Sequence, residues 1–155
     1  MNRPAANLTS HKLYSAPPQF CEAMLHDIEQ AERYIYLEMY KFGNDDVGNR
    51  FLQALTRAAD RGVQVKLLLD SWGVSNHDTF FNDLVASGAE VRFFRKIIYT
   101  FDFFTKNHRR NHRKFLLIDD HVSYIGSANI TGYSQQWRES MIRLTGGITL
   151  MFKRS

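Results

Sequence analysis

Cysteine and long apolar runs are both scarce in this chain of 155 residues. The single cysteine, Cys21, excludes an internal disulfide, fits a reducing compartment, and lies in a helical pattern where a small buried side chain is expected. The uninterrupted apolar runs are at most four residues long, as in Phe115 to Ile118, whereas a membrane-spanning helix needs about 20 apolar residues. The first residues, Met1 to Ala6, lack the apolar core of a secretory signal. We therefore expect no transmembrane helix, no export and a cytoplasmic location.

What the chain does contain is enough apolar side chains for one packed core. Hydrophobic residues make up 44% of the sequence and aromatic residues 14%, which predicts a single domain over residues 1–155. The net charge of +4 is unevenly placed: residues 92–114 carry eight of the twenty Lys and Arg against one acid, Asp102. Such a block indicates either an anionic partner or a solvated loop.

Strand and helix patterns alternate through the first 94 residues. The expected order is a strand at 12–14, a helix from 17 to about 33, a strand at 34–40, a helix from 47 that Gly62 ends, a strand at 63–69, a helix at 78–86 and a strand at 91–94. This spacing suits right-handed crossovers between parallel strands. We predict an α/β fold with a mixed, mostly parallel sheet sandwiched between helices. A short amphipathic helix is expected after Gly146, and the chain looks cut where the fold would continue, so we expect a C-terminal truncation or half of a larger enzyme.

The polar residues from 111 to 129 stand out against this background. His112 and Lys114 are two apart in a run that continues into Phe115–Ile118, so a strand would direct both side chains to one face. Asp119 follows, and then Gly126, Ser127 and Asn129. The expected face would carry a nucleophile and a cation.

This spacing, His-x-Lys-x4-Asp followed after six residues by Gly-Ser-x-Asn, resembles the signature of the phospholipase D superfamily (the HKD motif). The similarity extends to Asp45, Gly48 and the stretch 62–70, which look like the region before the motif in cardiolipin synthases. It covers the chain from about Tyr14 onward, with 97–110 the least typical part. The resemblance implies a phospholipase D-like fold with one HKD half-domain, most like the N-terminal half of a bacterial cardiolipin synthase-type phosphatidyltransferase, peripheral at the inner membrane.

The chemistry of these residue types suits a phosphodiester. An anion under attack needs neighbours that neutralise its oxygens, which Lys114 can do as a point charge and Asn129 as an amide donor. Gly126 and Ser127 let the backbone and a hydroxyl approach phosphate closely. Imidazole is largely unprotonated at neutral pH and nucleophilic, so His112 is the expected nucleophile.

Two carboxylates complete the candidate catalytic set. Asp119 is expected just beyond the strand, where it would support the site through hydrogen bonds without touching substrate. In the superfamily an acid at about the distance of Glu139 holds the ring of the motif histidine, so the resemblance implies that role for Glu139, which could otherwise be a surface residue at the start of a strand. His108 and His112 have the spacing of some zinc pairs, but no Cys or Glu completes a set, and we expect neither metal nor cofactor.

The segment 97–104 is aromatic and runs into Lys106, Arg109 and Arg110. Aromatic residues among cations can enter a lipid headgroup region, stack on the bases of single-stranded nucleic acid, or simply fill the core. The sequence leaves all three readings open.

The resemblance implies a two-step reaction through a phosphohistidine, with a second histidine from a second motif protonating the leaving alcohol. This chain carries one motif, so the other must come from a second half in cis or from a homodimer. We expect a phosphatidyltransferase or phospholipase D acting on anionic phospholipid at a membrane surface. The alternatives are a homodimeric endonuclease acting on nucleic acid and a catalytically incomplete anion-binding half-domain.

Overall fold

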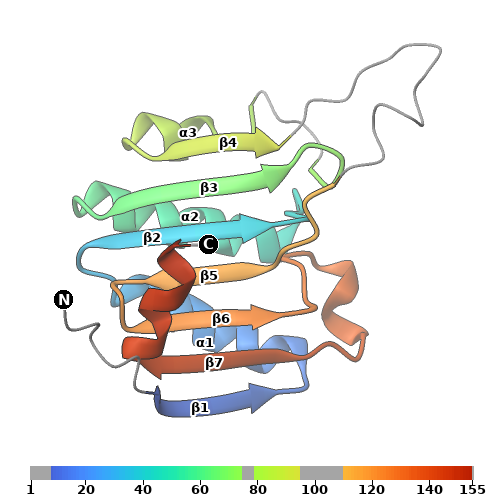
Figure 1. The fold of residues 1–155 in the computed structure, drawn as a ribbon. Coiled ribbons are helices and arrows are strands. Elements are labelled where there is room, and N and C mark those ends of the chain that lie inside the picture. Colours follow the sequence, from blue (N-terminus) through green and yellow to red (C-terminus); the bar gives the residue numbers. More distant parts are fainter. Residues whose placement is uncertain (1–7, 75–78, 95–109, 155) are drawn as a thin grey trace.

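The computed structural model describes residues 8–74, 79–94 and 110–154, which form one seven-stranded mixed sheet with helices packed on it (Figure 1). In chain order the elements are β1 (Leu8–Tyr14), α1 (Pro17–Glu29), β2 (Tyr34–Met39), α2 (Asp46–Asp60), β3 (Gln64–Asp70), α3 (Asn82–Ala86), β4 (Glu90–Phe94), β5 (Phe115–Ile118), β6 (Val122–Gly126), the 3-10 helix η1 (Tyr133–Gln136), β7 (Met141–Gly146) and the 3-10 helix η2 (Gly147–Arg154). The strands lie in the order β1-β7-β6-β5-β2-β3-β4.

The predicted mixed α/β fold is confirmed, but its strands do not run mostly parallel. Only β2–β3 and β3–β4 pair in parallel, whereas the other four neighbouring pairs of the described sheet are antiparallel. The reason is the length of the later connections. A parallel pair needs a long crossover, while β5 and β6 are joined by the three-residue turn Asp119-Asp120-His121 and form a hairpin.

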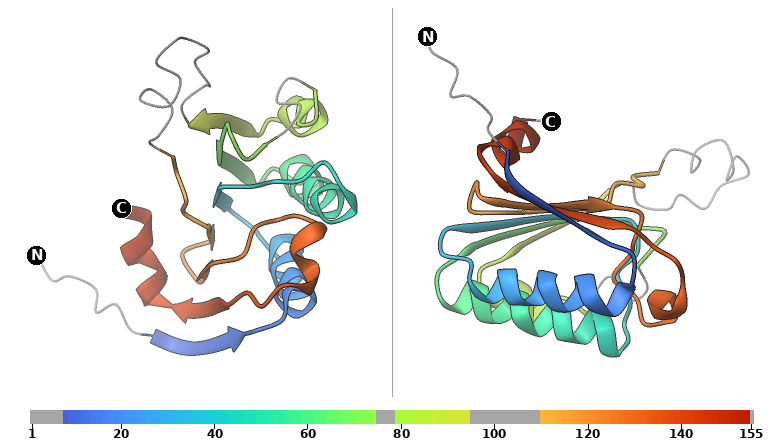
Figure 2. Two further views of the ribbon diagram at one scale, coloured as in Figure 1. Left: turned by 90° about the vertical axis from the view of Figure 1, so that its right-hand side faces the viewer. Right: turned by 90° about the horizontal axis from the view of Figure 1, so that it is seen from below.

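Helices cover the two faces of the sheet unequally (Figure 2). The helices α1, α2 and α3 lie together on one face, and η2 lies on the other, where the Phe152 ring contacts the Phe115 ring at a centroid distance of 5.7 Å. Over β2, β3 and β4 this second face is hollowed by a shallow pocket of about 450 Å³ lined by residues such as Tyr36, Lys66 and Glu90. Helices therefore cover one face of the sheet, whereas the second face is covered only in part.

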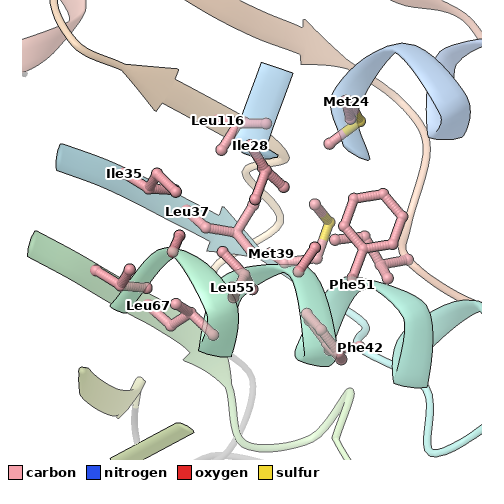
Figure 3. Packing of buried hydrophobic residues seen from close by; sticks show 14 of the residues in the cluster. Met24, Ile28, Ile35, Leu37, Met39, Phe42, Phe51, Leu55, Leu67 and Leu116 are labelled. Atoms are coloured by element: carbon pink, nitrogen blue, oxygen red, sulfur yellow. The ribbon is translucent and has the colours of Figure 1, made fainter. Parts of the chain in front are cut away.

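The main core lies between β2, β3 and the helices α1 and α2 (Figure 3). Phe51 and Leu55 on α2 are one helical turn apart and face Leu37 and Met39 of β2, and all four are almost fully buried. At the start of α2, Asp45 accepts a hydrogen bond from the backbone N–H of Gly48. This cap fixes where the helix begins.

Several predicted boundaries differ from those observed. Helix α1 ends at Glu29 rather than near residue 33, and β5 begins at Phe115, so His112 and Lys114 precede the strand instead of lying in it. The short helix expected after Gly146 is present as η2. Among the described ranges, no helix has the length and apolar content to cross a bilayer.

Candidate active site

The candidate site lies at the edge of the sheet where β2 and β3 end and β5 begins. Glu38 of β2 is paired in register with Phe115, so the residues that follow β2 lie beside those that precede β5. The backbone N–H of Gly126, at the end of β6, donates to the Lys114 carbonyl at 3.4 Å. Segments far apart in the sequence therefore meet at one edge, on the right of Figure 1.

His112 is held by a ring contact. Its imidazole stacks on Tyr40 with a centroid distance of 4.0 Å and an angle of 18° between the planes. Within the described residues the imidazole makes no hydrogen bond to a carboxylate. The ring is thus oriented by Tyr40, and its nitrogens remain available to substrate and to a proton donor or acceptor.

Lys114 lies next to the same aromatic ring. Its Nζ donates to the His112 carbonyl at 2.8 Å and lies 5.4 Å from the centre of the Tyr40 ring. Partial burial lowers the pKa of Lys114, although the charge of Glu139 acts in the opposite direction and Lys41 lowers it further. An anion placed here would gain a close cation that water does not fully screen.

A pocket of about 300 Å³ opens beside His112 and Lys114. Its lining consists of Glu38, His112, Arg113, Lys114, Phe115, Ile125, Gly126 and Phe152. An added Cβ on Gly126 would overlap the carbonyl oxygen of Ser140, so only glycine permits this close approach of β6 to the start of β7. The pocket combines the cations Arg113 and Lys114 with apolar side chains and with the carboxylate of Glu38.

Ser127 and Glu139 form a second polar pair of the site. The Ser127 hydroxyl donates to Glu139 Oε2 and accepts from the backbone N–H of Ser140 at 3.2 Å. The sequence-based expectation was that Glu139 holds the ring of His112, whereas in this structure its hydrogen-bond partner is Ser127. The charge of Glu139 raises the pKa of Lys114, and its role toward His112 stays a prediction.

Asn129 links the site to the residues after β2. Its Oδ1 accepts from the backbone N–H of Lys41 at 3.1 Å, and the N–H of Ile130 donates to the Lys41 carbonyl at 3.2 Å. Because the carbonyl end of the Asn129 side chain is engaged, its amide N–H groups are the end left to donate to a substrate oxygen.

Asp119 lies away from this group, at the opposite end of β5. Its carboxylate accepts from the backbone N–H groups of Glu32, Arg33 and Tyr34 at 2.7 to 2.8 Å. The structure therefore does not bring Asp119 together with His112. It connects the β5–β6 turn to the start of β2, far from His112, so the structure does not support the expectation that Asp119 belongs to the catalytic set or supports it through hydrogen bonds.

The sequence reasoning missed residues that follow β2 and β3. Tyr40 was expected only as the last residue of a strand, and no role was predicted for Lys41 or Asp70. Asp70 is 0% exposed and accepts from the backbone N–H of Asn111 at 2.7 Å, with the Arg110 guanidinium 3.5 Å away. It thus anchors the segment that leads into His112. The carboxyl ends of parallel strands share one edge of a sheet, and that rule could have identified all three.

Two sequence-based expectations fall outside the described residues. The aromatic segment 97–104 and His108 lie in the undescribed range 95–109, so neither the membrane reading nor the zinc pair can be compared with the structure. Within 8–74, 79–94 and 110–154, no group of three or more His, Cys, Asp or Glu is arranged to hold a metal ion.

Comparison with known proteins places this geometry in a family. Residues 24–148 match the family described as "Cardiolipin synthase, PLD-like domain". The cardiolipin synthase of Clostridium perfringens strain 13 is 40% identical over 118 residues, covering 76% of this chain and 25% of that protein. That of Listeria welshimeri is 36% identical over 134 residues, covering 81% and 27%. The chain spans about a quarter of the length of these relatives.

Solved structures share the fold at low sequence identity. The phospholipase D family member Nuc from Salmonella typhimurium superposes with a TM-score of 0.70 at 22% identity, covering 94% of this chain and 88% of Nuc. NucT from Helicobacter pylori superposes with a TM-score of 0.69 at 16% identity, covering 94% and 91%. With the family match over most of its length, the chain belongs to the phospholipase D superfamily, in the family of cardiolipin synthase PLD-like domains.

Proposed function

We propose that this chain carries half of an active site that transfers phosphatidyl groups between phospholipids, or hydrolyses them, through a covalent phosphohistidine at His112. The observation that carries the proposal is that His112 and Lys114 line one pocket in a chain 36–40% identical to cardiolipin synthases, with Asn129 bound to Lys41 at the same edge of the sheet. Lys114 and the Asn129 amide would hold the phosphate oxygens, and Gly126 in the pocket lining and Ser127 next to it would offer a close backbone and a hydroxyl.

The first step is an exchange of bonds at phosphorus. A ring nitrogen of His112 forms a P–N bond as the P–O bond to the departing alcohol breaks, and a second histidine supplies the proton that the alkoxide takes up. In the second step an acceptor alcohol, or water, gives its proton to that second histidine and its oxygen to phosphorus, which releases His112. Lys114 offsets the charge on the phosphate oxygens throughout.

This scheme needs a second histidine at the same phosphate. Of the described histidines, only His112 lies at this edge, since His121 follows the β5–β6 turn at the opposite edge and His11 and His26 lie on β1 and α1. The missing group would come from a second half, as the partial coverage of the cardiolipin synthases suggests, or from a second copy across a two-fold axis.

A second candidate function is that of a homodimeric endonuclease of the same superfamily. The observation in its favour is length, because the chain covers 88% of Nuc and 91% of NucT, so chains barely longer than this one carry the fold. In that case the same histidine would attack a phosphodiester of nucleic acid, and the site would be symmetric.

The test is product formation with a matched histidine control. Purified chain, at concentrations where two copies associate or with a second HKD half added, is incubated with phosphatidylglycerol vesicles, and cardiolipin and phosphatidic acid are measured by mass spectrometry. His112→Asn should abolish product and acid-labile phosphorylation of the protein, whereas His121→Ala, an exposed histidine at the other edge, should retain both.

Other outcomes assign other functions. Cleavage of single-stranded DNA that requires His112, without any lipid product, supports the endonuclease. Binding to anionic vesicles that weakens steeply with salt and survives His112→Asn, with no turnover of either substrate, supports an anion-binding half-domain. Normal lipid turnover in His112→Asn would refute the nucleophile assignment.

A further inference from the structure

Two large aromatic side chains are exposed at the same sheet edge as the candidate site. Tyr133 of η1 is 49% exposed and Trp137, the residue after η1, is 55% exposed, and their rings meet edge to face at a centroid distance of 5.3 Å. Helix η1 lies between the end of β6 and the start of β7, beyond the ends of the strands (Figure 1). Exposed aromatic groups next to a functional site indicate a contact surface.

A continuous series of ring and cation contacts connects this pair to His112. The Lys41 ammonium lies 5.3 Å from the centre of the Tyr133 ring and 5.9 Å from that of Tyr40, and Tyr40 stacks on His112. A side-chain hydrogen bond with Tyr133 raises the pKa of Lys41, so this group is charged at neutral pH. We call Tyr133, Trp137 and Lys41 the aromatic rim.

We propose that the aromatic rim enters the headgroup layer of an anionic phospholipid bilayer and so brings His112 to the lipid phosphates. The inference rests on the proposed function, for which it names the surface that meets the substrate. Trp and Tyr rings prefer the boundary between headgroups and acyl chains because they combine apolar rings with a polar N–H or O–H. Lys41 and the exposed Arg138 beside Trp137 supply charge that complements anionic lipid.

The same contacts argue against two other occupants. Stacking of successive bases needs several free ring faces, whereas the Lys41 ammonium lies over Tyr133 and the edge-to-face contact between Tyr133 and Trp137 occupies part of these two rings. A second copy of this chain seated on the rim itself would bring Lys41 and Arg138 of both copies together, which like charges oppose, so a second half that supplies the other histidine would have to meet His112 without covering the rim. A membrane interface meets neither difficulty.

Fluorescence of Trp137 tests the inference directly, because the chain has only two tryptophans. In the full chain carrying His112→Ala and Trp72→Phe, Trp137 is the remaining reporter. Vesicles of phosphatidylglycerol and phosphatidylcholine should shift its emission to shorter wavelength, and brominated acyl chains should quench it relative to unbrominated lipid. Unchanged emission with vesicles, or quenching by single-stranded DNA alone, would overturn the proposal.

Vesicle partitioning provides the second readout. Tyr133→Ser with Trp137→Ser should weaken partitioning onto the same vesicles by about tenfold or more, from the apolar area that no longer enters lipid. Val85→Ser is the matched control, since Val85 is 50% exposed on α3, outside the site edge. Equal partitioning of the double variant and the wild type contradicts the proposal. Insertion of the wild type without turnover, in the dimer or with a second HKD half added, would refute the proposed function alone. Turnover without insertion would refute the rim alone.

Discussion

Asp119, a residue of the HKD signature, joins the β5–β6 turn to the backbone before β2, at the edge opposite His112. Its carboxylate accepts three backbone N–H groups, and it adopts a positive φ of 52° in the β5–β6 turn. Asp119→Ala would leave these donors without their acceptor and place Ala in a left-handed conformation. We expect the free energy of unfolding to fall by about 2 to 4 kcal/mol, measured by urea denaturation.

Asp119→Gly separates the two causes. Glycine adopts the positive φ without strain but supplies no carboxylate. The free energy of unfolding of Asp119→Gly should therefore exceed that of Asp119→Ala by less than about 1 to 2 kcal/mol. Any loss of activity in either variant should follow the loss of folded protein. A fully folded, stable Asp119→Ala chain would mean that the three hydrogen bonds contribute little.

Lys114 gives a pH dependence of stability whose direction follows from its lowered pKa. Between that lowered value and the ordinary 10.5 of an unfolded lysine, the folded state binds fewer protons than the unfolded state. The free energy of unfolding should therefore rise with pH across this window, relative to Lys114→Met, which has no such group. Urea denaturation of both proteins at a series of pH values measures the difference. If the free energy of unfolding changed with pH by the same amount in the wild type and in Lys114→Met, the result would contradict the burial of this lysine.

At the residue scale, the motif named candidate residues but not their neighbours. His112, Ser127 and Asn129 lie at one edge of the sheet, and their roles in catalysis stay predictions. Tyr40 contacts His112, and Lys41 contacts Asn129. Neither residue was predicted, because a pattern along the chain does not indicate which strands become neighbours.

At the scale of elements, the start of helix α2 depends on a close backbone approach. An added Cβ on Gly48 would overlap the Gly43 carbonyl oxygen, and Asp45 ties this turn to the backbone N–H of Gly132 at 2.7 Å. Gly48→Ala should therefore displace the turn and lower the melting temperature, at a cost of about 1 to 3 kcal/mol.

Gly132→Ala is the matched control for this turn. Its added Cβ would lie 3.4 Å from the Asp45 side chain, an ordinary contact, and the backbone at Gly132 is helical. Its melting temperature, followed by circular dichroism, should stay close to that of the wild type. Equal losses in the two variants would show that the approach of Gly48 to Gly43 is not the cause.

The elements themselves were largely predictable, and their pairing was less so. The periodicity of the first 94 residues indicated the strands and helices to within a few residues, because burial of one face imposes a fixed period on the sequence. The run from His112 into Phe115 looked like one strand, yet β5 begins only at Phe115. The segment before it is held by the buried Asp70, a long-range contact that no local pattern reveals.

At the scale of the whole molecule, the proposed mechanism needs a second histidine that one copy of the described residues does not supply. We expect turnover only from the fraction of chains that is dimeric or joined to a second HKD half. Light scattering and product formation, measured at the same protein concentrations, should rise together. Full activity from a chain that scatters as a monomer would exclude the need for a second histidine.

The sequence by itself determined the mixed α/β class, the core-facing residues and the chemistry of the motif, because side-chain type and period act locally. The tertiary structure alone decided that β5 lies beside β2 and β1 beside β7, so that Tyr40 meets His112 and Asp119 braces the far edge. Strand order depends on pairing between distant segments, whose hydrogen bonds are the same for any sequence. Which strand ends lie next to each other, and so form one site, therefore depends on the order of the strands in the folded sheet.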